Sequence, residues 1–151
     1  MPKKMKFHYL VRGITFINGK VLLVRHLGAS NTFLPGGHIS IGEKAETALA
    51  REIEEEIGNK AIVQRFIGAV ECTWEENNQN NHEINLVFEV AIPDIDSITP
   101  AHSNENHLEF YWVEPKELKT YNLQPYPLVK CIMDWKDNYN GFWGTTMNQR
   151  S

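Results

Sequence analysis

The chain has 151 residues, a formal net charge of −4 and a hydrophobic content of 42%. A chain of this length is long enough for one domain with a sizeable core. We therefore expect a single domain over residues 1–151, with its core at about 7–139 and a tail at 140–151. The negative charge argues against a general binder of nucleic acid or of anionic membranes, and no apolar run in the sequence approaches the length of a membrane span.

The cysteines and the start of the chain bear on its location. Cys72 and Cys131 lack the spacing of a metal or redox motif, which indicates free thiols in a reducing compartment. The first 13 residues are basic, but Arg12 interrupts their apolar run and no small-residue cleavage site is present. This pattern is not that of a signal peptide. The sequence therefore predicts a cytoplasmic protein.

The chain begins with a predicted β-hairpin. Residues 7–17 and 20–26 are rich in β-forming side chains and meet at Asn18-Gly19. Both turn residues tolerate positive φ, which makes this dipeptide a strong hairpin signal. A loop over residues 27–31 is expected to follow the second strand.

A glycine turn and a helix come next. A short strand at 32–34 ends before a proline, and Gly36 and Gly37 then allow the backbone to turn tightly and approach a ligand or metal. The periodicity predicts a helix over residues 43–57. Gly58 is expected to end it in a left-handed conformation.

The middle of the chain predicts two long strands. Residues 61–74 are expected to form one strand, broken near Gly68, and residues 82–92 alternate as a returning antiparallel strand. Between them, residues 76–81 (ENNQNN) are interpreted as a polar loop that buries nothing. Residues 93–107 form a longer loop, and loops of that length in a compact domain are often functional.

The last part of the chain adds one strand and two helices. We expect a strand at 108–113, a short helix at 115–118 and a final helix at 127–139, with a loosely held tail from Gly141. We find no internal repeat or second domain in the sequence. Periodicity alone thus supports an α+β fold in one domain.

The central helix carries a cluster of carboxylates. Glu52, Glu55 and Glu56 fall within an arc of roughly 100° on one helix face, and that arc overlaps the apolar stripe of the same helix. A solvated charge run would lie opposite the stripe, as Glu54 does. Carboxylates crowded on a partly buried face repel each other and lose hydration unless a cation joins them. Mg²⁺ is the natural partner for such oxygen ligands.

The surrounding residues match a family pattern. The matching positions are Gly37, Glu43, Arg51, Glu52, Ile53, Glu55, Glu56 and Gly58. They fill G-x5-E-x7-R-E-U-x-E-E-x-G-U, where U is a bulky aliphatic residue, so the chain resembles the Nudix hydrolases. Asn59 departs from the last aliphatic position, which is a packing position in the family. The resemblance implies the Nudix fold, an α/β/α sandwich with a mixed central β-sheet.

The resemblance also implies a role for each matching polar residue. Glu52, Glu55 and Glu56 become the ligands of a divalent cation, Mg²⁺ or alternatively Mn²⁺, with the carbonyl of Gly37 as a further ligand. Arg51 is expected to brace either Glu43 or Glu55 and so to fix the ligand helix against the glycine loop, a kind of placement that tunes a metal site.

The general base is left open between several glutamates. In the family it lies either within the matching pattern or on a later loop. Glu55 and Glu56 are the candidates within the pattern, and Glu105 is the candidate in the long loop, where it is alternatively a solvated residue. Glu83 and Glu89, on the preceding strand, are weaker candidates.

Other side chains have both a functional and a plain interpretation. His38, Arg12 and Arg25 are candidates for contacts with phosphate, although a loop histidine and strand arginines also occur for structural reasons. The aromatic candidates for stacking on a base are Phe33, Trp74 and Phe110. Aromatic residues in strands more often pack in the core.

The resemblance implies an Mg²⁺-dependent pyrophosphohydrolase. Its expected partner is a small molecule, a nucleoside diphosphate linked to another moiety, and no nucleic acid or membrane is expected. The alternatives are a house-cleaning hydrolase of noncanonical or oxidised (d)NTPs, a non-catalytic nucleotide sensor, and a protein-interaction module. The complete set of glutamates argues against a sensor. Many relatives dimerise, and the sequence leaves monomer and homodimer open.

Overall fold

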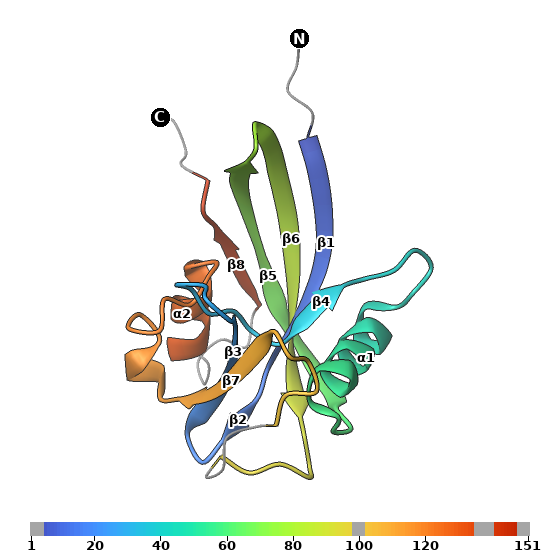
Figure 1. The fold of residues 1–151 in the computed structure, drawn as a ribbon, viewed down its shortest axis with the longest axis vertical. Coiled ribbons are helices and arrows are strands. Elements are labelled where there is room, and N and C mark those ends of the chain that lie inside the picture. The colour runs from blue at the N-terminus through green and yellow to red at the C-terminus, as the bar shows by residue number, and fades with distance from the viewer. Residues whose placement is uncertain (1–4, 98–101, 135–140, 148–151) are drawn as a thin grey trace.

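The computed structural model describes residues 5–97, 102–134 and 141–147. The elements in chain order are β1 (Met5–Ile14), β2 (Phe16–Ile17), β3 (Lys20–His26), β4 (Gly36–His38), α1 (Ala45–Ile57), β5 (Ile62–Glu76), β6 (Gln79–Ala91), β7 (Leu108–Val113), η1 (Pro115–Glu117), α2 (Pro127–Met133) and β8 (Phe142–Thr145). They form a five-stranded sheet in the order β4-β1-β6-β5-β8 and a three-stranded sheet in the order β2-β3-β7 (Figure 1). Because β1 pairs parallel to β6 and antiparallel to β4, the larger sheet is mixed.

The first hairpin confirms its turn but divides the predicted first strand. Asn18 and Gly19 have φ values of 52° and 77° and join β2 to β3. The predicted strand at 7–17 is in fact two strands that separate at Thr15 and enter different sheets. The buried Thr15 carbonyl accepts a hydrogen bond of 3.2 Å from the backbone N–H of Leu22. The chain therefore passes from one sheet to the other without leaving the core.

Helix α1 begins two residues later than predicted. Lys44 is its N-cap and makes no side-chain capping bond. The carboxylate of Glu43 lies outside the helix and accepts from the backbone N–H of Ser40 at 3.1 Å. The end is as predicted: Gly58 has a φ of 79°, and its N–H donates to the Glu54 carbonyl at 2.9 Å.

Strands β5 and β6 are longer than predicted and meet in a tight turn. The turn consists of Asn77 and Asn78, with φ values of 52° and 61°. The polar-loop interpretation of 76–81 is wrong, because asparagine tolerates positive φ and lets both strands continue. Asn81 is only 4% exposed, and its amide donates to the Gln79 carbonyl. The predicted break near Gly68 is confirmed as register shifts between Val63 and Gly68.

The C-terminal part contains a strand where the sequence predicts a loose tail. Residues 142–145 form β8, which pairs parallel to β5 and extends the sheet. Strand β7 and the short helix η1 are confirmed. Helix α2 ends at Met133, earlier than predicted, and the predicted extension over 135–139 lies outside the described residues. None of the helices in the described ranges has the length and apolar character needed to cross a membrane.

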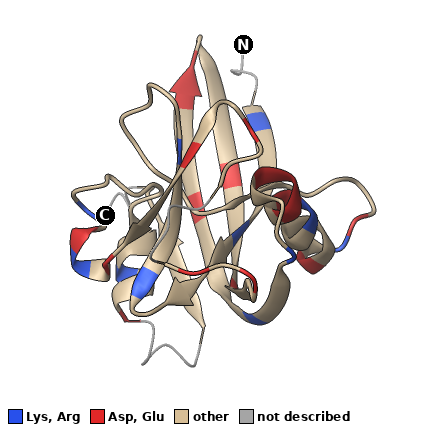
Figure 2. Cartoon of the chain, turned by 60° about the horizontal axis from the view of Figure 1, so that its bottom comes forward, with Lys and Arg blue, Asp and Glu red and all other residues tan. Residues whose placement is uncertain are grey.

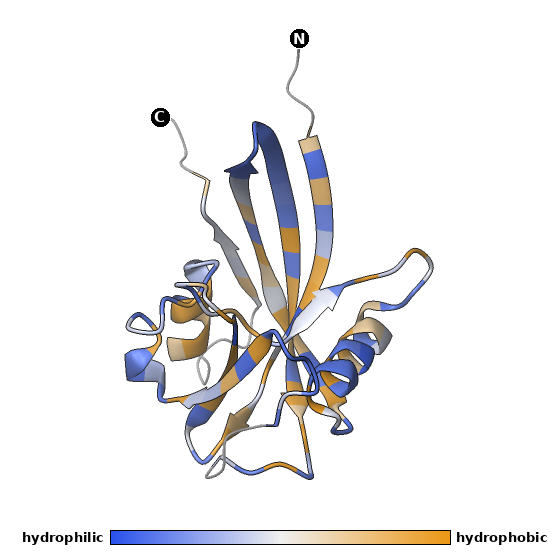
Figure 3. Ribbon diagram, viewed as in Figure 1, coloured by the Kyte–Doolittle hydropathy of each residue, from blue (hydrophilic) through white to orange (hydrophobic). Residues whose placement is uncertain are grey.

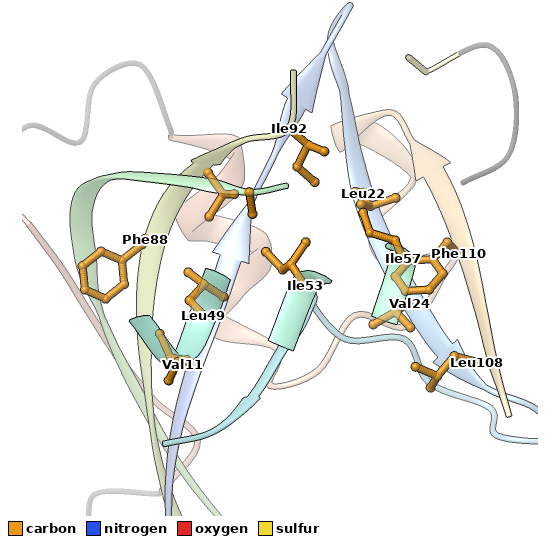
Figure 4. Close-up of a cluster of buried hydrophobic side chains, with 13 residues drawn as sticks. Val11, Leu22, Val24, Leu49, Ile53, Ile57, Phe88, Ile92, Leu108 and Phe110 are labelled. Atoms are coloured by element: carbon orange, nitrogen blue, oxygen red, sulfur yellow. The ribbon is translucent and has the colours of Figure 1, made fainter. Parts of the chain in front are cut away.

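Alternating side chains place the two helices on opposite faces of the sheets. In β3, Leu22 and Val24 join one apolar cluster, whereas the intervening residues join the other. Leu49 and Ile53 of α1 pack in the first cluster (Figure 4), and α2 packs in the second. Apolar residues gather where the helices cover the strands, and the β5–β6 tip is hydrophilic (Figure 3). The predicted α+β fold with a mixed β-sheet is thus confirmed.

Candidate metal centre and catalytic cleft

A cleft of about 430 Å³ opens beside the N-terminal strand, the glycine turn and α1. Its lining residues come from strands β1 and β3 to β7, from α1, and from the segments before β4 and before β7. They are His8, Leu10, Arg12, His26, Phe33, Gly36, Gly37, His38, Glu52, Glu56, Trp74, Glu83, Glu105, His107 and Leu108. The cleft therefore brings together carboxylates from the helix and from the long loop, which lie about 50 residues apart in the sequence.

The glycine turn allows α1 to lie directly against β4. Gly36 has a φ of 144°, and a Cβ atom built there would lie 2.0 Å from the Val11 carbonyl oxygen. A Cβ atom on Gly37 would lie 2.5 Å from Cδ of Glu52. Only glycine fits at Gly36, and any side chain at Gly37 would displace the Glu52 carboxylate. As a result, the Glu52 carboxylate rests on the backbone at Gly37.

Glu56 is a buried carboxylate with incomplete hydrogen bonding. The residue is 6% exposed, and its Oε2 atom has no hydrogen-bond partner among the described residues. Burial raises the pKa of Glu56 to about 8; the nearby Arg12 charge opposes this rise, and the charges of Glu52 and Glu105 add to it. The backbone of Gly36 supplies one hydrogen bond to the carboxylate. In this state Glu56 requires a proton or a cation.

Arg51 binds three carboxylates on and beside α1. Its guanidinium forms a bidentate pair with Glu43, at 2.8 and 3.0 Å, and contacts Glu52 and Glu55 at 3.2 Å each. It also donates to the His38 carbonyl at 3.3 Å, which ties α1 to β4. The Arg51 hydrogen bonds hold the pKa of Glu43 down at about 2. Arg51 thus contacts both partners that the sequence left open.

The three predicted helix ligands are divided between two environments. Glu52 and Glu56 line the cleft, and burial raises the pKa of Glu52. The side chain of Glu55 is 52% exposed and pairs with Arg51. Within the residues that the structure describes, no group of three or more His, Cys, Asp or Glu side chains is arranged to hold a metal ion. Figure 2 shows the acidic residues grouped on α1, with basic residues beside them.

The long loop reaches the end of α1 through backbone contacts. The N–H of Asn104 donates to the Glu56 carbonyl at 2.8 Å, and the His107 carbonyl accepts from Leu27 at 2.9 Å. These bonds place the loop over the cleft. Glu105 lines the cleft there, and its carboxylate lies 3.7 Å from Nδ1 of His107. Glu105 therefore lies in the cleft, and its functional role stays a prediction.

The remaining candidates fall inside or outside the cleft. Arg12 lies in it, donates to the Leu34 carbonyl at 3.1 Å, and lies 5.2 Å from the Phe33 ring centroid. Arg25 does not line it and instead pairs with Glu109. The remaining candidates in the cleft are His38, Phe33 and Trp74, whereas Phe110 packs in the core and Glu89 pairs with Arg65.

Sequence reasoning missed or underrated several residues of the cleft. His8, His26 and His107 had no assigned role, and Glu83 was considered weak. His8 donates to or accepts from His38 at 3.1 Å and contacts Asn81 at 2.8 Å. His8 and Arg12 lie four residues apart on one strand, so they share a face. That alternation was the available signal for His8.

Comparisons with known proteins agree with the geometry. The NUDIX domain family matches residues 7–131. The nucleoside triphosphatase NudI of Escherichia fergusonii is 33% identical over 97 residues, which cover 60% of this chain and 66% of that protein. The ADP-ribose pyrophosphatase of Methanocaldococcus jannaschii is 28% identical over 84% of this chain and 73% of its own length. The CTP pyrophosphohydrolase of Escherichia coli is 27% identical over 85% of this chain and 93% of its own length.

Solved structures show the same fold. The E. coli ORF135 protein superposes with a TM-score of 0.60 at 25% identity, covering 91% of this chain and 96% of that protein. The MutT protein of Methanosarcina mazei Go1 superposes with a TM-score of 0.67 at 19% identity, covering 93% of this chain and 99% of that protein. The family match spans most of the sequence and includes the whole carboxylate helix. The chain therefore belongs to the Nudix family of hydrolases, enzymes that act on phosphoanhydride bonds.

Proposed function

We propose that this Nudix hydrolase uses Mg²⁺, with Mn²⁺ as an alternative, to cleave the pyrophosphate linkage of a nucleoside diphosphate joined to another moiety. The observation that carries the proposal is the buried Glu56 carboxylate, whose Oε2 atom has no partner in the described part of the chain. A desolvated carboxylate is stabilised by protonation or by a bound cation. The neighbouring carboxylates of Glu52 and Glu105 add oxygen donors, which suit a hard divalent ion.

The proposed ligands are those on the helix and the glycine turn. Glu52 and Glu56 would hold the cation together with the Gly37 carbonyl. Glu55 would join them after its side chain leaves Arg51, to which it is bound at 3.2 Å. A cation at this position would neutralise the diphosphate, polarise its phosphorus and lower the pKa of an attacking water.

The other residues would position the reactants and move a proton. Arg51 and Glu43 would hold α1 against β4, because Arg51 also donates to the His38 carbonyl. Arg12 supplies a positive charge inside the cleft and would bind a substrate phosphate. For the general base, Glu105 gains support because it faces Glu56 in the cleft, and Glu56 and Glu55 stay as the alternatives.

A second candidate substrate class is the nucleoside triphosphates, including noncanonical or oxidised ones. The names of two relatives, a nucleoside triphosphatase and a CTP pyrophosphohydrolase, favour it. The ADP-ribose pyrophosphatase favours the nucleoside diphosphate derivative instead. Both classes present a pyrophosphate linkage to the same carboxylates, so substrate turnover decides between them.

We also propose that residues 1–151 form one catalytic domain in the cytoplasm. Cys72 and Cys131 are free and buried, which supports a reducing compartment. Fractionation of the native cells tests the location. Sedimentation of the purified protein decides between a monomer and the homodimer that the sequence left open.

A turnover screen with Mg²⁺ tests the proposal. The panel holds ADP-ribose, dinucleoside polyphosphates, nucleotide sugars, CoA, and ordinary and oxidised dNTPs, with Glu56→Gln as the blank. We expect at least one compound to be hydrolysed by the wild type and spared by the variant. Tight nucleotide binding without turnover of any compound would favour the sensor, and neither binding nor turnover would contradict both readings.

A further inference from the structure

The catalytic cleft continues into a second, wider arm. This arm has a volume of about 900 Å³ and shares Arg12, His26, Phe33, Trp74 and Glu83 with the cleft. It runs between β5, β6 and the segment that carries Tyr126. A substrate whose phosphates lie at the carboxylates can therefore extend past Arg12 into the arm without leaving the protein surface.

The charges of the arm argue against a second phosphate group there. Among the described residues that line it, Arg12 is the sole lysine or arginine, and it lies where the arm joins the cleft. Glu76 and Glu83 add negative charge. The aromatic rings of Phe33, Trp74 and Tyr126 also line the arm and can stack on a planar group. An uncharged nucleobase fits this combination better than a phosphorylated group does.

Neighbouring hydrogen-bond donors hold Glu83 in place. The indole N–H of Trp74 donates to its Oε1 atom at 2.7 Å, and the amide of Asn85 donates to its Oε2 atom at 2.9 Å. Asn85 is fully buried, and its amide also donates to the Val70 carbonyl while its oxygen accepts from Arg12 at 3.4 Å. The orientation of Glu83 is thus set by Trp74 and by Asn85, and Asn85 is itself held by its bonds to Val70 and Arg12. The Cys72 thiol is a third hydrogen-bond partner of this carboxylate. Because a carboxylate can accept about four hydrogen bonds, about one acceptor site remains for a ligand in the arm.

We propose that the arm binds the nucleobase and that Glu83 accepts a hydrogen bond from an exocyclic amino group of that base. The proposal rests on the hydrolase function given above and names the class of base that this site takes. Cytosine and adenine carry such an amino donor, whereas uracil and hypoxanthine carry a keto oxygen at the same position. A keto oxygen would face the carboxylate acceptor and leave it unpaired, which a site built for a donor rejects strongly.

Matched substrate pairs test the proposal with either substrate class. The pairs are CTP with UTP, and ADP-ribose with its hypoxanthine analogue, each measured as kcat/KM with Mg²⁺. We expect the wild type to prefer the amino member by at least about tenfold. In Glu83→Gln the ratio should fall toward one, because a carboxamide can also donate to a keto oxygen.

The matched control is Glu89→Gln on the same strand, where the carboxylate pairs with Arg65 away from the cleft. Glu89→Gln should keep the wild-type ratio of kcat/KM values. If the loss of any carboxylate on β6 were enough to change the ratio, Glu89→Gln would change it too. Trp74→Phe serves if Glu83→Gln does not fold: it keeps a ring but removes the donor that orients Glu83, so it should lower the ratio as well.

Equal kcat/KM values within each pair for the wild type, or an unchanged ratio in a folded Glu83→Gln protein, would overturn the proposal. An absence of turnover for every nucleotide would instead contradict the hydrolase function. In that case the dissociation constants of the same pairs, measured by calorimetry, carry the test. A tenfold preference for the amino member supports the role of Glu83, and equal constants overturn it.

Discussion

Two sets of carboxylates on the same segment differ in where their countercharge comes from. Glu43 and Glu55 pair with Arg51, and the pKa of Glu43 is held down at about 2. Glu56 lies on the cleft side, where burial raises its pKa to about 8 and its Oε2 atom lacks a partner among the described residues. Arg51 thus neutralises the charges of Glu43 and Glu55 from within the chain. At Glu56 the nearby Arg12 charge does not offset the effect of burial, and the proposed cation from solution would.

The largest expected effect comes from Glu56→Gln. The amide is nearly the same size but gives the cation a weaker ligand, so turnover should fall by about two orders of magnitude or more. Steady-state kinetics on a substrate from the screen, with circular dichroism to confirm the fold, measures it. An unchanged kcat/KM would remove Glu56 from the metal site.

Gly37→Ala should disrupt the same side of the comparison by steric means. The new methyl group would lie 2.5 Å from the Glu52 Cδ atom and would displace that carboxylate. Since Gly37 does not have positive φ, the backbone tolerates alanine. We expect turnover to fall by about 10- to 100-fold, because ligand displacement costs metal affinity, while thermal unfolding changes little. If Gly37→Ala had the turnover of the wild type, the position of the Glu52 carboxylate would not matter for catalysis.

Arg51→Lys tests the internally paired set. Lysine keeps the positive charge but cannot reproduce the fork that binds Glu43 twice and also reaches Glu52 and Glu55. We expect roughly tenfold weaker apparent Mg²⁺ affinity in activation curves, with saturating Mg²⁺ restoring much of the rate. A rate that Mg²⁺ does not restore would point to a direct role of Arg51 at the substrate.

Glu105→Gln should lower turnover about tenfold if the loop supplies a ligand to the cation, and kcat by about 100-fold if it supplies the general base. Glu105 shares the cleft with Glu56, and Gln keeps its size. The exposed Glu54→Gln variant is the control on α1. Wild-type rates for Glu105→Gln would return the role of general base to Glu55 or Glu56.

The last prediction concerns stability without added metal. Because the folded-state pKa of Glu56 is raised to about 8, the folded protein binds more protons than the unfolded chain between the two pKa values. Its contribution to stability is therefore present below about pH 4.5 and is lost as the pH rises to about 8, by on the order of 1 kcal/mol per pH unit. Denaturant unfolding of wild type and Glu56→Gln over this range should show a difference that grows with pH. A difference between the two proteins that does not change with pH would contradict a raised pKa of Glu56 in the folded state.

The elements that the sequence predicts well are those with local signals. The Asn18-Gly19 turn and the Gly58 helix end depend on backbone conformations that few residues adopt, so they are visible in the sequence. The same physics also produced an error: Asn77-Asn78 adopts positive φ as well, but it lies in a polar run that resembles a loop. Residues 142–145 gave no warning of a strand, because their pairing with β5 is a contact between distant segments.

The site shows the same division between local and distant information. The positions of Glu52, Glu55 and Glu56 follow from helix geometry, but the burial of Glu56 and the exposure of Glu55 depend on how α1 packs. Glu83 looked unremarkable on its strand. Its place in the cleft comes from the pairing of β6 with β1 and β5, which brings it near Arg12 and Trp74. A single sequence does not state strand register across such distances.

Calorimetric titration of Mg²⁺ and Mn²⁺ into the purified protein tests the metal assignment most directly. It compares wild type, Glu56→Gln and the Glu54→Gln control without any substrate, so it does not depend on finding one. We predict that wild type and Glu54→Gln bind the cation with equal affinity and that Glu56→Gln binds it at least about tenfold more weakly. Equal binding by all three proteins, or none by the wild type, would contradict a cation site at the buried carboxylate.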